Sequence, residues 1–463
     1  MRDFRGPNPA PVLAVLLGLA GFGLGTSLVT SPELVLPLTF QMVFLALFTF
    51  LLLGRERDEE DRSWLFRLVA AAIGVRFLAL LVVHYVFPPY FFALDAVSYE
   101  RVGAALSNYW QGLGPEPRLQ GGHWLPGYYH LNAIFHYVLG EPAMGAIVLN
   151  LFAGVWTVLI TFKLAKETMG KEVAKTAALF TAFFPSLILW SVLNIRDSLA
   201  GMAVVFTVLY GIRTFRIPRP DHLFFLGFGL ILLTALRDYM GFLCLAGLAL
   251  GAVAAIRPQR IVSTLAGGTV LVLFLSLVAN RLDLFPAEVL EDPFSSASRM
   301  RESLQYGATS AFGSGYETET LGGSVRYLPV GFAFLLFAPF PWAIETTLQA
   351  AAAPETLLWY PVLIFALLGM KNSVLQGKHL TVIPLSVLII VTTSYALVEG
   401  NFGTAYRHRA QIMPLFFIFA AVGWMSLKPW FEQRRRMRKR SVLFRRGGSA
   451  DPVMRPSGPR KRG

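Results

Sequence analysis

The stretch "AALFTAFFPSLILWSVLNIRDSL" (residues 177–199) contains the two features that decide the fold of this chain. A long apolar run comes first, and the charged pair Arg196-Asp197 ends it. A second apolar run ends in the same way at Arg237-Asp238, within "TALRDYM". A helix of about 20 apolar residues spans the hydrocarbon layer of a membrane and satisfies its own backbone hydrogen bonds. The stretch therefore predicts a membrane helix that ends in two charged residues. Charged residues next to a membrane segment are retained where they have a partner of opposite charge, are hydrated or serve a function.

Similar runs recur along the 463 residues, of which 55% are hydrophobic and only 15% are charged. This composition predicts an all-α polytopic integral membrane protein with about twelve transmembrane helices. An outer-membrane barrel is excluded because its strands would alternate apolar and polar residues, whereas these runs are continuous. The single cysteine, Cys244, excludes disulfides and cysteine-based metal sites. We expect the spans at residues 10–30, 34–54, 65–87, 143–163, 174–195, 198–213, 222–236, 240–256, 261–280, 356–370, 380–398 and 410–427.

Charge predicts the orientation of these spans. Most of the net charge of +13 lies in residues 428–463, which carry 13 Lys and Arg against two acidic residues. A polybasic segment directly after a last span is typical of a cytoplasmic anchor on anionic lipids, so we expect no nucleic-acid partner. The positive-inside rule then places both termini in the cytoplasm and two large loops, 88–141 and 281–355, outside. The proline-rich segment 327–342 is expected to be re-entrant or interfacial on the outer side.

These expectations divide the chain into three parts. Residues 1–64 form a transmembrane hairpin and a cytoplasmic loop, residues 65–427 form the transmembrane core with the outer loops, and residues 428–463 form the basic tail. The style of the loops indicates the inner membrane of a bacterium.

Polar residues from separate stretches share the predicted outer boundary of the membrane, which indicates one site on that face. Its candidate residues are Asp95, Tyr99, Glu100, His123, Arg196, Asp197, Arg237, Asp238, Tyr406, Arg407, His408 and Arg409.

Asp95 is the candidate general base of this site. The segment "LDAVSYERVGAALSNYW" reads as a helix with Asp95 near its start, close to the apolar "FFAL". A partly desolvated carboxylate suits proton abstraction from a hydroxyl. The alternative is that Asp95 only caps the helix.

The arginines suit a phosphate group, because a guanidinium binds phosphate oxygens through paired hydrogen bonds and stays charged. The aspartates Asp197 and Asp238 are expected to orient the arginines beside them. The alternative is structural, with both Arg-Asp pairs tying helix ends together. We expect no certain cofactor, and a divalent metal on Asp95, Glu100 and His123 is the less favoured interpretation.

The residues resemble a known family. The outer loop that opens with "ALDAVSYERVGAAL" is similar to the first outer loop of the GT-C type glycosyltransferases that use polyprenyl-phosphate sugars. This class includes the protein mannosyltransferases of glycosyltransferase family 39 and the lipid A aminoarabinose transferases. The segments "HWLPGYYHLNAIFHYVLG" and "GTAYRHRAQIMPLFFIFAAVGW" are similar to the family's lead into the next span and to its last outer loop. The resemblance covers residues 65–424, preceded by an additional hairpin and without a clear paired acidic motif.

The resemblance implies a GT-C-like fold and an inverting single displacement. Asp95 would act as the base, and Arg196, Arg237, Arg407 and Arg409 would contact the phosphate or sugar. The acceptor would be a hydroxyl of a glycan, lipid or protein. A lipid-linked donor needs no nucleotide-binding loop, and the chain has no GxGxxG or Walker A pattern.

Two other functions remain open. An O-antigen-type polymerase or ligase would use undecaprenyl-diphosphate-linked glycans and would depend on arginine and histidine more than on Asp95. A transporter, flippase or scaffold would place its charges nearer the bilayer midplane.

Overall fold

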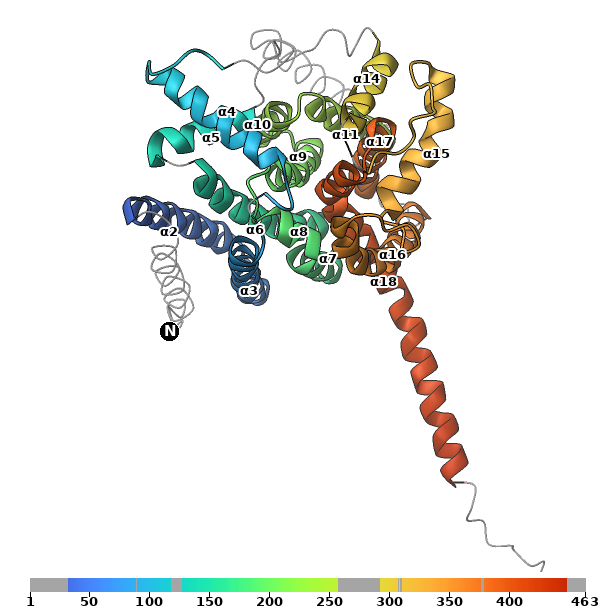
Figure 1. Cartoon of the computed structure of the whole chain (residues 1–463). Coiled ribbons are helices and arrows are strands. Elements are labelled where there is room, and N and C mark those ends of the chain that lie inside the picture. The colour runs from blue at the N-terminus through green and yellow to red at the C-terminus, as the bar shows by residue number, and fades with distance from the viewer. Residues whose placement is uncertain are drawn as a thin grey trace, which may run out of the picture.

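The computed structural model describes residues 32–88, 90–117, 127–140, 142–256, 292–306, 308, 310–375 and 379–447 (Figure 1). Within these ranges the chain is helical, and the β structure is limited to an isolated bridge between Ala311 and Asn401. The helices of the N-terminal half are α2 (Pro32–Gly54), α3 (Glu59–Val86), α4 (Asp95–Trp110), α5 (Gly127–Leu139), α6 (Pro142–Met169), α7 (Lys171–Phe183), α8 (Pro185–Trp190), α9 (Asp197–Arg216), α10 (Pro220–Leu236) and α11 (Met240–Ala255). Those of the C-terminal half are α14 (Pro293–Gln305), α15 (Leu321–Phe337), α16 (Thr347–Leu375), η2 (His379–Thr381), α17 (Val382–Val398) and α18 (Phe402–Gly447).

The predicted all-helical membrane class is confirmed. Among the described residues, six helical segments are long and apolar enough to cross a membrane: α3, α6, α9, α16, α17 with η2, and α18. Four shorter apolar helices, α2, α10, α11 and α15, accompany them. The predicted number of twelve spans is not confirmed, and the expected spans 10–30 and 261–280 lie outside the described residues.

Two of the differences between the predicted boundaries and the structure concern the segments that carry site residues. The expected span 174–195 is divided into α7 and α8, because Phe184 is extended and Pro185 starts a new helix without an N–H to donate. The expected last span, 410–427, begins earlier, because α18 starts at Phe402 and includes the polar stretch before it. Figure 1 shows α18 leaving the bundle as one long helix.

The core of the bundle surrounds the first half of α18, where Ile412, Phe417 and Phe419 are fully buried. Helices α16, α9, α7 and α17 pack around it. Figure 1 shows α2 and α3 on one flank of the bundle and α14 and α15 on the other. Glycines allow the closest approach: a Cβ built on Gly369 of α16 would lie 1.8 Å from the carbonyl oxygen of Phe419. Backbone contact at this distance requires glycine, so α16 and α18 meet at that position.

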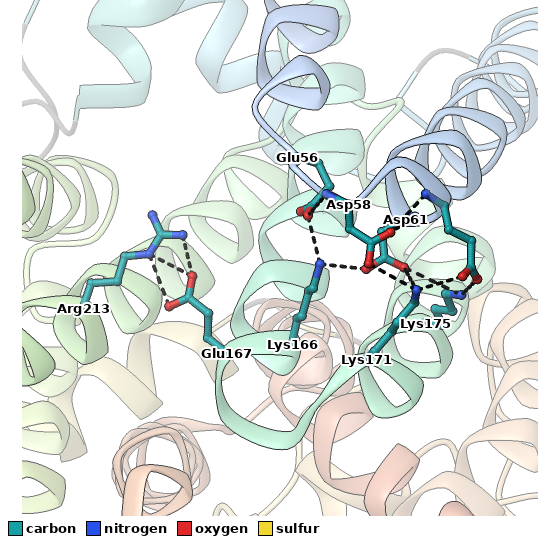
Figure 2. A network of polar contacts seen from close by, with 9 residues as sticks. Glu56, Asp58, Asp61, Lys166, Glu167, Lys171, Lys175 and Arg213 are labelled. Carbon is teal, nitrogen blue, oxygen red and sulfur yellow. Dashed lines mark hydrogen bonds and ion pairs between the residues drawn. The ribbon is translucent and has the colours of Figure 1, made fainter. Parts of the chain in front are cut away.

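A charge network joins the helix ends at one end of the bundle (Figure 2). The side chain of Asp61, at the start of α3, is fully buried and lies 2.7 Å from Nζ of Lys166 and 3.0 Å from Nζ of Lys171. Beside it, Glu167 of α6 pairs with Arg213 of α9 at 2.6 Å. The segments "GRERDEEDR" (residues 54–62) and "KLAKETMGKEVAK" (residues 163–175) therefore contact each other.

The network lies at the N-terminus of α3 and at the C-termini of α6 and α9. The opposite ends of α3 and α6 adjoin the predicted outer loop 88–141. Asp197 starts α9, and the 20 residues of that helix separate it from the network by about 30 Å.

Candidate functional site

The break between α8 and α9 is held by a buried amide. Residues 191–196 are not helical, so their backbone carbonyls need donors other than helix N–H groups. Asn150 of α6 supplies them: its Nδ2 lies 2.8 Å from the carbonyl oxygens of both Leu193 and Ile195. This side chain fixes the path of the chain into α9, which begins with the predicted site residues.

Asn194 connects the same break to α5 and α4. Its Nδ2 donates to Oδ1 of Asn132 at 2.9 Å, and its Oδ1 accepts from the hydroxyl of Tyr128 at 2.9 Å. The same Nδ2 lies 3.4 Å from Oε1 of Glu100, whose other oxygen accepts from the hydroxyl of Tyr90 at 2.6 Å. The bond to Glu100 raises the pKa of Tyr90 to about 12. Glu100 therefore lies at the edge of the site, held by neutral donors.

In the two Arg-Asp dipeptides, the arginine of one contacts the aspartate of the other, and not the aspartate beside it. Asp197 of the first pair accepts from Nη2 of Arg237 of the second pair at 3.0 Å. The amide of Gln411 donates to the same Oδ1 of Asp197, and Nη1 of Arg237 donates to the hydroxyl of Tyr239 at 3.2 Å. Asp197 and Arg237 are only 3% and 5% exposed. This buried ion pair ties the start of α9 to the end of α10. Arg237 is therefore oriented by Asp197, the aspartate of the other Arg-Asp pair.

The other two members of these pairs are more accessible. Arg196 is half-buried, and its Nη1 donates to the carbonyl oxygen of Leu236 at 3.0 Å. Asp238 is exposed, and its Oδ1 accepts from the backbone N–H of Tyr239 at 3.1 Å. The expected orientation of Arg237 by Asp238 is therefore wrong, because Asp238 turns to the backbone and to solvent.

Asp95 meets an arginine from the far end of the chain. Nη1 of Arg407, on α18, donates to Oδ2 of Asp95 at 2.6 Å. The side chain of Asp95 is 50% exposed, whereas that of Arg407 is 16% exposed. The N-cap of α4 is Leu94, without a side-chain cap, so Asp95 is not the capping residue of its helix. As the first residue of α4, its negative charge is favoured by the helix N-terminus.

Tyr99 lies on the buried face of α4, one turn after Asp95. Its ring packs against that of Tyr128, with the centroids 4.7 Å apart. Burial raises the pKa of the Tyr99 hydroxyl, and the charges of Arg196 and Asp95 act on it. We call the group Asp95, Tyr99, Arg196, Asp197, Arg237 and Arg407 the arginine–aspartate cluster.

His408 borders this cluster through a buried acid. Its Nδ1 is hydrogen-bonded to Oε1 of Glu399, and its ring stacks on that of Tyr395 at 4.4 Å. Thr404 donates to the other oxygen of Glu399 at 2.8 Å. Burial raises the pKa of Glu399, which lies between α17 and α18, to about 8. At neutral pH Glu399 therefore retains its proton, so that no unpaired carboxylate charge is buried beside His408.

Tyr406 and Arg409 point to another face of α18. The hydroxyl of Tyr406 donates to Glu355 at 2.7 Å, and the guanidinium of Arg409 lies over the rings of Tyr406 and Trp359. Nη1 of Arg409 donates to the carbonyl oxygen of Ala338 at 2.9 Å. The expectation that all four arginines share one pocket is therefore wrong for Arg409, because residues two apart on a helix face nearly opposite directions.

The structure thus brings most of the predicted site residues together, while Asp238, Tyr406 and Arg409 are directed elsewhere. His123 lies outside the described residues. Within those residues, no group of three or more His, Cys, Asp or Glu side chains could hold a metal ion.

Sequence reasoning missed Gln411, Glu399 and Asn150. Each is an isolated polar residue inside or beside an apolar run, and such a residue is costly in a membrane without a partner. An isolated polar residue in an apolar run was therefore the signal that could have identified them, because such a side chain must find a polar partner within the bundle.

Comparison with known proteins supports one class. Residues 123–282, about a third of the chain, match the model of the family described as dolichyl-phosphate-mannose-protein mannosyltransferase. The match confirms the predicted resemblance to GT-C type glycosyltransferases over that region. No curated protein matches the chain.

Solved structures of an oligosaccharyltransferase from the archaeon Archaeoglobus fulgidus are similar to this chain. The apo form is 13% identical, with a TM-score of 0.48, and the similarity covers 81% of this chain and 52% of that one. A complex of the enzyme, named AglB, with an inhibitory peptide and a dolichol-phosphate is 15% identical, with a TM-score of 0.45, over 86% of this chain and 53% of that one. The chain therefore spans about half the length of the structures it matches.

Proposed function

We propose that this chain is a membrane glycosyltransferase that moves a sugar from a polyprenyl-phosphate-linked donor to an acceptor hydroxyl. The observation that carries the proposal is the contact between Asp95 and Arg407. It joins a half-exposed carboxylate, which can accept a proton, to a guanidinium, which can bind a phosphate. The family match over residues 123–282 supports a donor of this class.

The chemistry requires one displacement. The acceptor hydroxyl transfers its proton to Asp95 while its oxygen attacks the anomeric carbon of the sugar. The bond from that carbon to the phosphate oxygen breaks, and its electron pair stays on the phosphate. Arg407 and Arg196 stabilise the departing phosphate, so no acid is needed to protonate it. One displacement inverts the anomeric centre.

Arg237 has a positioning role in this proposal. Its guanidinium is buried against Asp197, so it holds the start of α9 and thereby Arg196 in place. We place the reaction on the outer face of a bacterial inner membrane, with both termini in the cytoplasm. Glycan, lipid and protein hydroxyls are the acceptor classes, and anionic lipids are the partners of the basic tail.

A transfer assay tests the proposal. The purified chain is mixed with an acceptor extract and radiolabelled sugars on polyprenyl phosphate. We expect transfer by the wild type, loss of at least about 100-fold in the Asp95→Asn variant, and an inverted product. The exposed Glu116, in the loop that follows the C-terminal end of α4 at Trp110, provides the control variant Glu116→Gln, which should retain transfer. Transfer that persists in Asp95→Asn, from a diphosphate-linked glycan, would instead identify the polymerase or ligase class.

A further inference from the structure

The carboxylate and the guanidinium that the reaction needs occupy each other in this structure. Oδ2 of Asp95 accepts from Nη1 of Arg407 at 2.6 Å. While this ion pair is intact, one carboxylate oxygen is not available to a hydroxyl and one N–H of the guanidinium is not available to a phosphate. Opening the pair therefore frees both groups fully for the roles assigned above.

We propose that Arg407 exchanges Asp95 for the phosphate of the lipid-linked donor, so that donor binding itself releases the base. This inference rests on the proposed function and deepens it, because it makes activation of Asp95 dependent on the donor. An acceptor that arrives first meets a carboxylate engaged by Arg407.

Exposure decides which ion pair of the cluster can open. The Asp197–Arg237 pair is only 3% and 5% exposed, so separating it would leave a buried charge without a partner. The Asp95 side chain is 50% exposed and can be hydrated when it leaves Arg407. Its position at the N-terminus of α4 keeps its charge favourable in either state. The fixed pair thus holds the helices, and the accessible pair is free to exchange.

Charge makes the exchange balanced. The donor is a phosphodiester with one negative charge, equal to the charge of the carboxylate that it replaces, so Arg407 keeps one anionic partner. A phosphate also presents two oxygens to the guanidinium, which matches its forked donors. The exchange therefore needs no additional cation.

The same pair accounts for product release. After transfer, Asp95 carries the proton of the acceptor hydroxyl, and Arg407 holds a polyprenyl phosphate monoester with up to two negative charges. The neutral acid cannot compete for Arg407. Once Asp95 loses its proton to water, its carboxylate competes again and displaces the product.

Binding of undecaprenyl phosphate to the purified full-length chain tests the exchange without requiring an acceptor. Because Asp95 competes with the phosphate, Asp95→Asn should tighten binding by about fivefold, the size expected when a partly exposed ion pair no longer competes. Asp95→Ala should do the same, which separates loss of the charge from any new bond of the asparagine. Glu116→Gln removes the same charge from the loop beyond the far end of α4 and should change the dissociation constant by less than about twofold. Arg407→Gln should weaken binding, and it should abolish the gain when combined with Asp95→Asn.

The outcomes separate this inference from the proposed function. If Arg407→Gln weakens binding but both Asp95 variants bind as the wild type does, the exchange is refuted and the phosphate site stands. An equal gain in Glu116→Gln also refutes it, since the effect would then be one of overall charge. If the wild type and Arg407→Gln bind the lipid equally, Arg407 does not hold the phosphate, and both the exchange and the proposed role of Arg407 are wrong.

Discussion

The variant Asp197→Asn tests the buried ion pair at the centre of the arginine–aspartate cluster. It removes one charge and keeps the shape, so Arg237 is left 5% exposed with the hydroxyl of Tyr239 and a neutral amide as partners. Removing one partner of a buried pair costs about 3–5 kcal/mol. Because an asparagine oxygen still accepts a hydrogen bond, we expect the lower end of this range, about 3 kcal/mol.

Equilibrium unfolding in detergent with increasing denaturant measures this loss. Asp238→Asn is the matched control, since it makes the same change at the exposed acid of the second pair, and it should stay within about 0.5 kcal/mol of the wild type. The double variant Asp197→Asn/Arg237→Met removes both charges and should be more stable than Asp197→Asn alone. The reasoning fails if Asp197→Asn costs no more than Asp238→Asn, or if the two changes in the double variant are additive.

Three further predictions concern other parts of the bundle. Because burial raises the pKa of Glu399 from 4.5 to about 8, the folded chain retains a proton that the unfolded chain releases. The contribution of Glu399 to stability should therefore fall as pH rises from about 5 through 8. Melting temperatures of the wild type and of Glu399→Gln, measured across this range, should differ less at pH 8 than at pH 5, and a constant difference would contradict the prediction. Gly369→Ala should cost about 1–3 kcal/mol or prevent folding, because its Cβ would lie 1.8 Å from an α18 carbonyl oxygen. Gly54→Ala, whose Cβ would have nothing within 4 Å, should be neutral. Equal melting temperatures of the two variants would be evidence against the contact between α16 and α18. Asp61→Asn should cost about 1–3 kcal/mol in denaturant unfolding because its side chain is fully buried between lysines. Glu59→Gln, at a side chain that is 89% exposed, should cost almost nothing. A loss of equal size in both variants would show that the charge network does not stabilise the fold.

Much of the fold follows from local properties of the sequence. Membrane helices can be predicted because the length of an apolar run and the thickness of a bilayer together determine whether a segment spans it. The helix that starts at Asp95 and the helix α9 therefore coincide closely with their predicted ranges, whereas α3 begins before residue 65 and α6 continues past residue 163. The kinds of residue in the candidate site were also predictable, because a charge next to a membrane segment needs a partner or a function.

The pairing of those charges depended on the tertiary structure. At the end of a helix, adjacent side chains point in different directions. Arg196 and Asp197 therefore do not pair with each other but with Leu236 and Arg237. Asp95 instead meets Arg407, which is 312 residues away in the chain.

The sequence by itself thus determined that the chain is a helical membrane protein with charges at its helix ends. Only the packing of α4, α9, α10 and α18 decided which charges neutralise one another. The physical reason is that the energy of a charge in a low-dielectric environment depends on its neighbours in space, whatever their distance along the chain.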